Sequence, residues 1–522
     1  MNAASNVLRV LIILLIGVVI LGVLLLAAMV IIPGMSLFGV KFVSFAGGSD
    51  PDKKQTIDVN TSEWQNASTL VVNTNGWAVE LRPFSNVGDG KYRVTESSTN
   101  LRVLFYSQYT GFIKAKEEGD EKASYSITYG THLESGGGQA CIITTKEPDA
   151  VWMARANAKV VVLYDNGVLD NKKVFINTDS GKIYLGSDIL EGREQDKLKN
   201  VQITSKKGHI TVGNIDVTES LDISKESGGL ECKTNMTGNM KLSVSSGYGA
   251  IKVKNVGNPN AAENNISVNM NKIKNANMEF DTIYGNLQYM EGTSGLLRGN
   301  KVTGSLIVNP TDACSVKIDE IVKDVIFNSK SGSLYVSRVG GKIDSDMTGG
   351  GQIHIKSLGG SSNIKAQGGK VALGENFEGS KSVAAGVGGD VNITSVGGDI
   401  YVKTSGQNLN YNIRSKSGSV ELVDVNGTVD YAATDDGKSR IKMNYVALIG
   451  NNKITTFGGA VDLIIPTSVK ALLTWDSEKE TDIVVSGLQT KEKAGSQGIN
   501  GGSLTATLNI HTKVGKITIK TK

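Results

Sequence analysis

The chain has 522 residues, of which 62 are Gly and 7 are Pro, and its 55 Lys and Arg are nearly balanced by 51 Asp and Glu. This composition excludes a collagenous or disordered chain, and the small net charge disfavours a nucleic-acid partner. The three cysteines, Cys141, Cys232 and Cys314, are far apart, and the chain has four His. We therefore expect neither a disulfide framework nor a metal site, and no cofactor.

Residues 10–32 form a nearly pure run of Leu, Ile, Val, Ala and Gly without a charged residue. At about 1.5 Å per residue this run is about 35 Å long, enough to cross a hydrocarbon core of about 30 Å. A cleaved signal peptide is the alternative, but the run is too long for the apolar region of one. We expect an uncleaved single-pass helix in contact with membrane lipid, preceded by a short cytoplasmic N-terminus at residues 1–9.

The charges that flank this helix do not decide its orientation, because Arg9 stands on one side and Lys41, Lys53 and Lys54 on the other. Most of the chain follows the helix, and long domains translocate largely regardless of charge. We therefore predict a protein of the cell membrane whose large C-terminal domain is extracytoplasmic.

After a linker at residues 33–55, the chain consists of short strands separated by Gly, and no helical period is evident. One pattern dominates, in which Gly is followed by two apolar residues at the second and fourth positions. Strict alternation predicts a short strand with one buried face, and Gly allows the sharp corner before it. The pattern occurs at Gly181, Gly208, Gly228, Gly249, Gly285, Gly304, Gly332, Gly351, Gly369, Gly389, Gly398, Gly418, Gly459 and Gly515.

The spacing of these glycines predicts the architecture. Gly332, Gly341, Gly351, Gly360 and Gly369 follow one another at nine or ten residues, so two strands make a repeat of about 18 to 20 residues. Such repeats are typical of a β-solenoid, in which each rung buries its apolar residues against its neighbours. A stack of antiparallel sandwiches has similar turn spacing and is the alternative.

We therefore predict an all-β chain with one N-terminal transmembrane helix. The regular solenoid should occupy residues 159–522, and a less regular β region at 56–158 should cap it. This cap contains Trp64, Trp77 and Trp152.

The corners of the repeat resemble those of a bacterial putative-adhesin family of unknown function, whose β-solenoid repeats carry Ser or Thr before a Gly-Asp-Ile-type corner. The matching stretches are NTDSGKI at 177–183, SKSGSL at 329–334, GGDI at 397–400 and SKSGSV at 415–420. The C-terminus is similar too, with VDLIIP at 461–466, a Gly-rich stretch at 495–502 and LNIHTKVGKI at 508–517, where Lys516 replaces the Asp. The resemblance covers about residues 159–522. It implies a β-solenoid with a surface role and names no site residue.

Catalytic signatures are weak in this sequence. Gly437, Lys438 and Ser439 match only the end of a phosphate-binding loop, and Ala432 stands where its first Gly would be. Long parallel β-helices also include carbohydrate-active enzymes that use paired carboxylates. Candidates for such a pair are Asp390, Asp399 and Glu421, although Asp beside Gly is ordinary turn chemistry. No catalytic residue is assigned.

Aromatic residues occupy outward positions of three predicted strands, at Tyr184, Tyr335 and Tyr401. Such rings can stack on a sugar or anchor a protein partner, and Tyr also simply suits a strand. A surface glycan or a protein is therefore the candidate ligand.

The sequence thus favours a membrane-anchored, non-catalytic module for surface adhesion or envelope structure. A carbohydrate-active β-helix lyase or hydrolase and an accessory protein of an envelope-stress or signalling system are the alternatives. The last predicted strand contains Ile517 and Ile519, and Lys516, Lys520 and Lys522 beside them should protect a free terminal edge from pairing.

Overall fold

The fold is described from a computed structural model. It covers residues 2–31, 36–37, 40–45, 55–59, 61–83, 101–114, 124–133, 137–146, 150–164, 168–169, 172–187, 195–245, 250–260, 267–275, 277–433, 440–486 and 488–522. The chain divides into two compact units, the first ending at Glu219 and the second beginning at Ser220.

The N-terminal helix is confirmed as an apolar helix long enough to cross a membrane. α1 (Asn2–Ile31) contains the window Leu11–Ala28, whose mean hydropathy is 3.3 and of which no part is buried in the protein. The helix also includes residues 2–9, which the sequence analysis assigned to a separate N-terminal tail. Ile32, the predicted last residue of the segment, lies outside the described residues.

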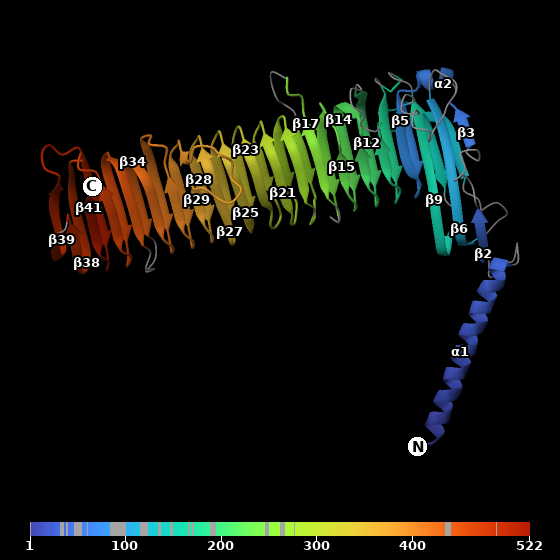
Figure 1. The fold of residues 1–522 in the computed structure, drawn as a ribbon, viewed down its shortest axis with the longest axis horizontal. Helices are drawn as coiled ribbons and strands as arrows, with labels where there is room; N and C mark the ends of the chain where they lie inside the picture. The colour runs from blue at the N-terminus through green and yellow to red at the C-terminus, as the bar shows by residue number, and fades with distance from the viewer. Residues whose placement is uncertain are drawn as a thin grey trace. The chain divides into compact units, whose positions relative to one another are not determined.

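The rest of the described chain is almost entirely β-structure, as the composition and alternation predicted (Figure 1). The exception is the short helix α2 (Thr61–Asn66), which has too few residues to produce a helical period in the sequence. The predicted linker at residues 33–55 also contains β-structure, namely β1 (Ser36–Leu37), β2 (Val40–Phe45) and the first residue of β3 (Gln55–Asp58).

Unit 1 contains both parallel and antiparallel pairs. Two parallel ladders run through it in the orders β8–β4–β10–β12 and β9–β5–β11–β13. The order of these strands in the ladders therefore differs from their order in the sequence. The repeat pattern of the sequence did not predict this difference. The strands of these ladders are β4 (Thr69–Thr74), β5 (Ala78–Pro83), β8 (Gly138–Lys146), β9 (Ala150–Tyr164), β10 (Lys173–Thr178), β11 (Ile183–Leu185), β12 (Asp196–Ser205) and β13 (Ile210–Val212).

Antiparallel strands complete unit 1. β6 (Leu101–Lys114) pairs with β9 along most of its length and with β2 and β3, and β7 (Ser124–His132) pairs with β8. The section of β9 from Val160 to Leu163 is fully buried on both faces, because Val161 and Leu163 form a second apolar cluster with Leu104 and Tyr106 of β6. This two-sided burial is consistent with the less regular alternation of the segment.

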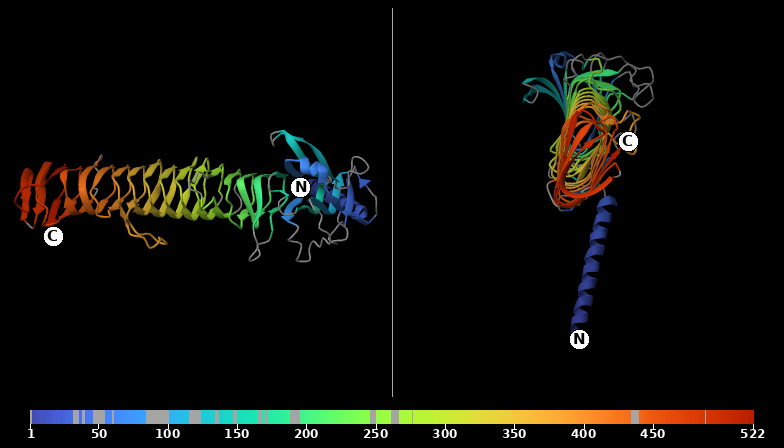
Figure 2. Two further views of the ribbon diagram at one scale, coloured as in Figure 1. Left: turned by 90° about the horizontal axis from the view of Figure 1, so that it is seen from above. Right: turned by 90° about the vertical axis from the view of Figure 1, so that its left-hand side faces the viewer.

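In unit 2, successive strands alternate between two parallel ladders, and through β27 each strand pairs with the strand two places further on (Figures 1 and 2). We call one passage through both ladders a circuit. The first ladder contains residues 220–225 of β14 (Ile215–Lys225), β16 (Asn239–Val244), β18 (Ser267–Asn271), β20 (Asn286–Met290), β22 (Leu306–Asn309), β24 (Val325–Ser329), β26 (Ile343–Met347), β28 (Ser362–Ala366), β31 (Val391–Ser395), β33 (Leu409–Ser415), the second half of β34 (Val420–Ala433), β36 (Gly450–Thr456) and β40 (Ala506–Thr512).

The second ladder contains β15 (Leu230–Cys232), β17 (Ile251–Val256), β19 (Met278–Ile283), β21 (Leu296–Val302), β23 (Ser315–Ile321), β25 (Gly332–Val339), β27 (Gly351–Leu358), β29 (Val371–Leu373), β32 (Ile400–Lys403), the first half of β34, β35 (Ile441–Leu448), β37 (Val461–Ile465) and β41 (Ile517–Thr521). The described pairs of these two ladders are parallel, which excludes the alternative of stacked antiparallel sandwiches.

The core lies between the two ladders of unit 2. The two apolar residues that follow each corner Gly point inward, as predicted, and they stack from one circuit to the next. One such column consists of Leu334, Ile353, Val371, Ile400 and Val420, each at most 1% exposed. Each circuit therefore buries its apolar residues by contact with its neighbours.

The corners explain why Gly recurs. Gly398 has a φ of 107°, and a Cβ there would lie 1.9 Å from the carbonyl oxygen of Gly369 in the preceding circuit. A side chain at this position would therefore meet both backbone strain and a direct clash.

Buried hydroxyl groups complete several of these corners, in agreement with the Ser or Thr of the repeat. Ser205, Ser329, Ser395 and Ser415 each donate a hydrogen bond to the carbonyl oxygen two residues later, at 2.6 to 3.2 Å. Each of these bonds gives a backbone carbonyl group at the turn a hydrogen-bond donor.

Lys225 occupies the corresponding inward position at the end of β14 and is 3% exposed. Its Nζ donates to the carbonyl oxygen of Gly229 at 2.7 Å. Burial lowers the pKa of its ammonium group from 10.5 to about 8.

The C-terminal end of unit 2 differs from the prediction. β41 pairs with β37 on one side and with β38 (Ala471–Val485) on the other, and β38 pairs antiparallel with β39 (Leu488–Ile499). The predicted free edge at Lys516, Lys520 and Lys522 is therefore wrong, because the β38–β39 hairpin returns over the last strand. Most of the described residues of β39 are exposed and polar, which suits an edge strand.

The inward column can be tested with a pair of substitutions. Ile353→Asp places a carboxylate in the core and should cost several kcal/mol of stability unless the group stays protonated. Ser333 lies on the outward side of the neighbouring strand β25, so Ser333→Asp should change the free energy of unfolding by less than about 0.5 kcal/mol. Urea unfolding of both variants measures the difference, and equal effects would contradict the assigned faces.

Lys225 predicts a specific pH dependence. The pKa of Lys225 is lower in the folded protein than in the unfolded chain, so the unfolded chain binds more protons between about pH 8 and 10.5. The free energy of unfolding therefore rises with pH through this window. Lys225→Met carries no charge, so its stability relative to the parent should fall between pH 7.5 and 9.5 by up to about 1.4 kcal/mol per pH unit. Urea midpoints at several pH values test this, with the exposed Lys241→Met as control. A pH-independent difference would show that Lys225 titrates normally.

Candidate functional site

The three carboxylates suggested by the sequence each bond to a residue of the neighbouring circuit. Asp390 accepts hydrogen bonds from the backbone N–H of Asn410 at 2.9 Å and from its side-chain amide at 3.2 Å. Asp399 accepts from the backbone N–H of Ser419 at 2.8 Å, and Glu421 pairs with Lys442 at 2.5 Å. Each bond joins one circuit to the next, so these carboxylates stabilise the stacking.

Two of the predicted outward tyrosines share one column of unit 2. Register places Tyr335 of β25 beside His354 of β27, which is followed by Ala372 of β29 and Tyr401 of β32. The hydroxyl group of Tyr335 donates to the Gln352 side-chain oxygen at 2.9 Å. An aromatic cluster with a histidine therefore lies on the outward face of these strands.

An insertion covers this part of the column. β29 and β30 (Gly386–Val387) both pair with β27, and residues 374–385 between them stand where β27 has the single residue Lys356. We call residues 374–385 the strap. The neighbouring circuit passes the same point with Lys356 alone, so the fold does not require an insertion of this length.

Aromatic contacts fix the strap to the sheet. Phe377 of the strap lies 5.5 Å from the ring of Tyr335 and 6.1 Å from that of His354, measured between ring centroids. Tyr335 and His354 themselves meet edge to face at 5.3 Å. The three rings thus form a small apolar cluster outside the main core.

Charged groups surround His354. Glu375 of the strap lies 3.6 Å from its Nε2 atom and forms an ion pair with Lys370 at 2.5 Å. Burial lowers the pKa of His354, and the Lys370 ammonium group lowers it further, against the opposing effect of Glu375. The lowered pKa favours the neutral form of the imidazole.

Buried polar groups hold the other half of the strap at Lys381. The backbone N–H of Lys381 donates to Ser337 Oγ at 2.9 Å, and its carbonyl oxygen accepts from Lys356 Nζ at 2.6 Å. Ser337 is 1% exposed and Lys356 is 8% exposed. The Lys381 ammonium group also pairs with Asp319 at 3.2 Å. Removing the strap would leave Ser337 and Lys356 without these bonds. The side chains of the sheet therefore provide specific hydrogen-bond partners for the backbone of the strap.

The docked strap presents polar side chains to solvent, among them Asn376 and Glu378. The sequence analysis singled out the two tyrosines and missed His354, Phe377 and Lys356. One feature of the sequence could have indicated the insertion. The regular glycine spacing is interrupted after Gly369, because the inserted residues separate it from Gly398, the next corner glycine of the same ladder.

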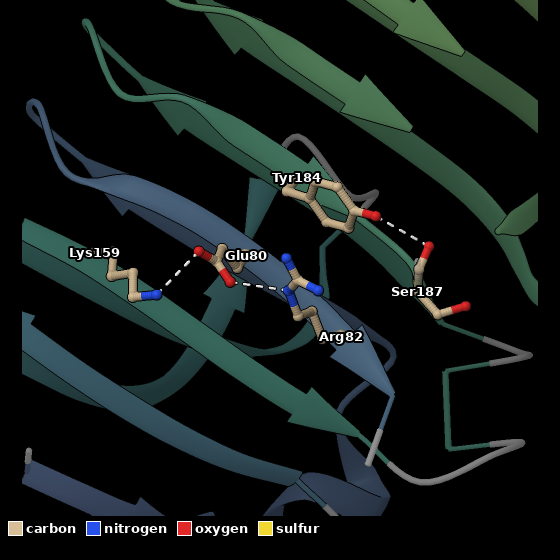
Figure 3. A network of polar contacts seen from close by, with 5 residues as sticks. All are labelled: Glu80, Arg82, Lys159, Tyr184 and Ser187. Carbon is tan, nitrogen blue, oxygen red and sulfur yellow. Dashed lines mark hydrogen bonds and ion pairs between the residues drawn. The ribbon is translucent and has the colours of Figure 1, made fainter. Parts of the chain in front are cut away.

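Tyr184 belongs to a different cluster, in unit 1 (Figure 3). The guanidinium group of Arg82 lies 4.2 Å from the centre of its ring, and its hydroxyl group donates to the carbonyl oxygen of Ser187 at 3.1 Å. Glu80 joins Arg82 at 2.9 Å and Lys159 at 3.1 Å. This network links β5, β9 and β11 across their outward face.

Two of the predicted cap tryptophans have structural roles in unit 1. Trp77 is fully buried and meets Phe105 edge to face. Trp64 is 1% exposed, and the Lys172 ammonium group lies 4.5 Å from the centre of its ring and donates to its carbonyl oxygen at 3.1 Å, near the C-terminal end of α2. The side chain of Trp152 lies outside the described residues, as do Gly437, Lys438 and Ser439.

Cys141, Cys232 and Cys314 are buried and free, and burial raises the pKa of each to about 12. Within the described ranges, no three His, Cys, Asp or Glu side chains are grouped so that they could hold a metal ion.

Comparison with known proteins gives no family. No family model and no curated protein matches the chain. The crystal structure of a putative cell adhesion protein from Clostridium sporogenes aligns over 90% of this chain and 99% of its own, at 10% identity and a TM-score of 0.15. At that TM-score the likeness carries no argument about fold or function.

The ring cluster predicts how the strap is held. Phe377→Ala removes the ring that contacts Tyr335 and His354, so the strap should detach more often and trypsin should cleave after Lys381 faster than in the parent. The exposed Asn376→Ala serves as the control and should leave the cleavage rate unchanged. Equal rates for the parent and Phe377→Ala would show that the rings do not hold the strap.

Proposed function

We propose that this protein is a membrane-anchored, extracytoplasmic β-solenoid that acts as a surface adhesion or envelope-structural module without catalytic activity. The observation that carries the proposal is α1, in which the whole window Leu11–Ala28 is apolar and none of it is buried by the protein. A water-exposed apolar surface of this size is costly, and a bilayer removes the cost.

The alternation of unit 2 between two parallel ladders supports the solenoid part of the proposal. Inward residues of each circuit stack on those of the next, and corners with Gly and Ser or Thr repeat, as in the adhesin-type repeats that the sequence resembles. A repeat of this kind displays long, regular outward faces, which suits a protein whose role is contact.

The surroundings of the candidate carboxylates support a non-catalytic role. Asp390 and Asp399 accept backbone hydrogen bonds, and Glu421 is paired with Lys442. A general acid or base must be placed to exchange a proton with a substrate, and these groups are engaged between circuits instead.

The strap is our candidate for the contact with a surface glycan or protein. It is not needed to connect the strands, yet buried groups and three rings hold it in place, and it exposes Asn376 and Glu378. Insertions in repeat proteins often lie on the binding face.

Protease treatment of intact cells tests the topology. If the domain is extracytoplasmic, added protease should remove the region after Lys53 while α1 stays in the membrane fraction. A chain that is cleaved only after lysis would reverse the orientation, and a chain absent from the membrane fraction would refute the anchor.

A further inference from the structure

The segment that follows α1 places one end of a β-sheet close to the membrane. α1 ends at Ile31, and β1 begins at Ser36. Five residues of chain span at most about 18 Å. Register pairs Ser36 with Lys41 and Leu37 with Val40, so the start of β2 lies only one strand spacing, about 5 Å, from β1.

β2 continues directly into a three-stranded sheet. Its residues Val40–Phe45 pair with residues 109–114 of β6, and this part of β6 pairs in turn with the beginning of β9. We call β2, residues 109–114 and residues 150–155 the proximal sheet end. If α1 spans a bilayer, its C-terminal end lies near the headgroups, and the proximal sheet end must begin there as well.

The composition of the proximal sheet end differs from that of the rest of the chain. Five of its eighteen residues are aromatic, against 6% in the whole chain, three are basic and none is acidic. The aromatic residues are Phe42, Phe45, Tyr109, Phe112 and Trp152, and the basic ones are Lys41, Lys114 and Arg155. Register places Phe112 beside both Phe42 and Trp152 in neighbouring strands.

Aromatic residues are enriched where a protein crosses the headgroup layer, and basic residues near a membrane surface favour anionic lipid. We propose that the proximal sheet end lies in the headgroup layer of the membrane that holds α1, as a second lipid contact of the protein. This inference rests on the membrane anchor of the proposed function. It gives unit 1 a fixed attachment to the membrane surface in place of a free tether.

Tryptophan fluorescence can test the contact in the full-length chain. α1 has no aromatic residue, Trp64 and Trp77 are 1% and 0% exposed, and Trp475 of unit 2 is 7% exposed. We would use liposomes of phosphatidylcholine and phosphatidylglycerol whose acyl chains carry bromine near the headgroups, because bromine quenches the fluorescence of a nearby tryptophan. Trp152 should account for most of this quenching. Trp152→Phe should lose most of it, and the matched Trp475→Phe should keep it.

Flotation of the same liposomes separates the two hypotheses. A chain that floats with the lipid but is quenched equally in the parent and Trp152→Phe keeps its anchor and overturns the second contact. A chain that does not float refutes the anchor itself.

The basic residues provide a further test. Changing Lys41, Lys114 and Arg155 to Gln should reduce the extra quenching that phosphatidylglycerol produces over phosphatidylcholine alone. A control with the exposed Lys241, Lys365 and Lys453 changed to Gln should behave as the parent. Unchanged quenching in the first triple variant would refute the preference for anionic lipid.

Discussion

Parallel pairing between equivalent strands of successive circuits is the constraint on which unit 2 depends. Each circuit contributes only a few inward apolar residues, and these are buried because the next circuit places equivalent residues against them, as in the column through Ile353 and Val371. The corner glycines follow from the same stacking, since a Cβ at Gly398 would collide with the backbone of the preceding circuit. A regular stack therefore limits what each corner can contain, and leaves the outward positions free to vary.

The outward polar groups have two kinds of role in this stack. Asp390, Asp399 and Glu421 each bond to the next circuit, so residues that resemble catalytic acids in the sequence serve cohesion in the structure. The groups around the strap differ, because the buried Ser337 and Lys356 bond to an insertion that the connection of strands does not require. Buried polar groups that find their partners in such an insertion indicate that its docked position matters.

The apolar helix and the repeat place different demands on the chain. α1 has an apolar surface that the protein leaves unburied, and the strands that follow it, β1 and β2, join an antiparallel sheet through β6. Unit 1 also contains circuits formed out of sequence order, with β8 and β9 preceding β4 and β5 in the ladders. The resulting sheet has apolar residues on both faces of β9, which gives unit 1 a second cluster outside the space between its ladders.

The sequence by itself determined the apolar helix, the all-β class and the inward residues of the repeat, because length, hydropathy and two-residue alternation are local properties of the chain. Only the tertiary structure decided the order of the strands in unit 1, the return of the β38–β39 hairpin over β41, and the grouping of Tyr335, His354 and Phe377. Each of these depends on contacts between residues distant in sequence, and a strand carries the same alternation whichever neighbour it pairs with. For the same reason the sequence identified Tyr335 and Tyr401 as outward residues but could not show that an insertion covers part of the face between them.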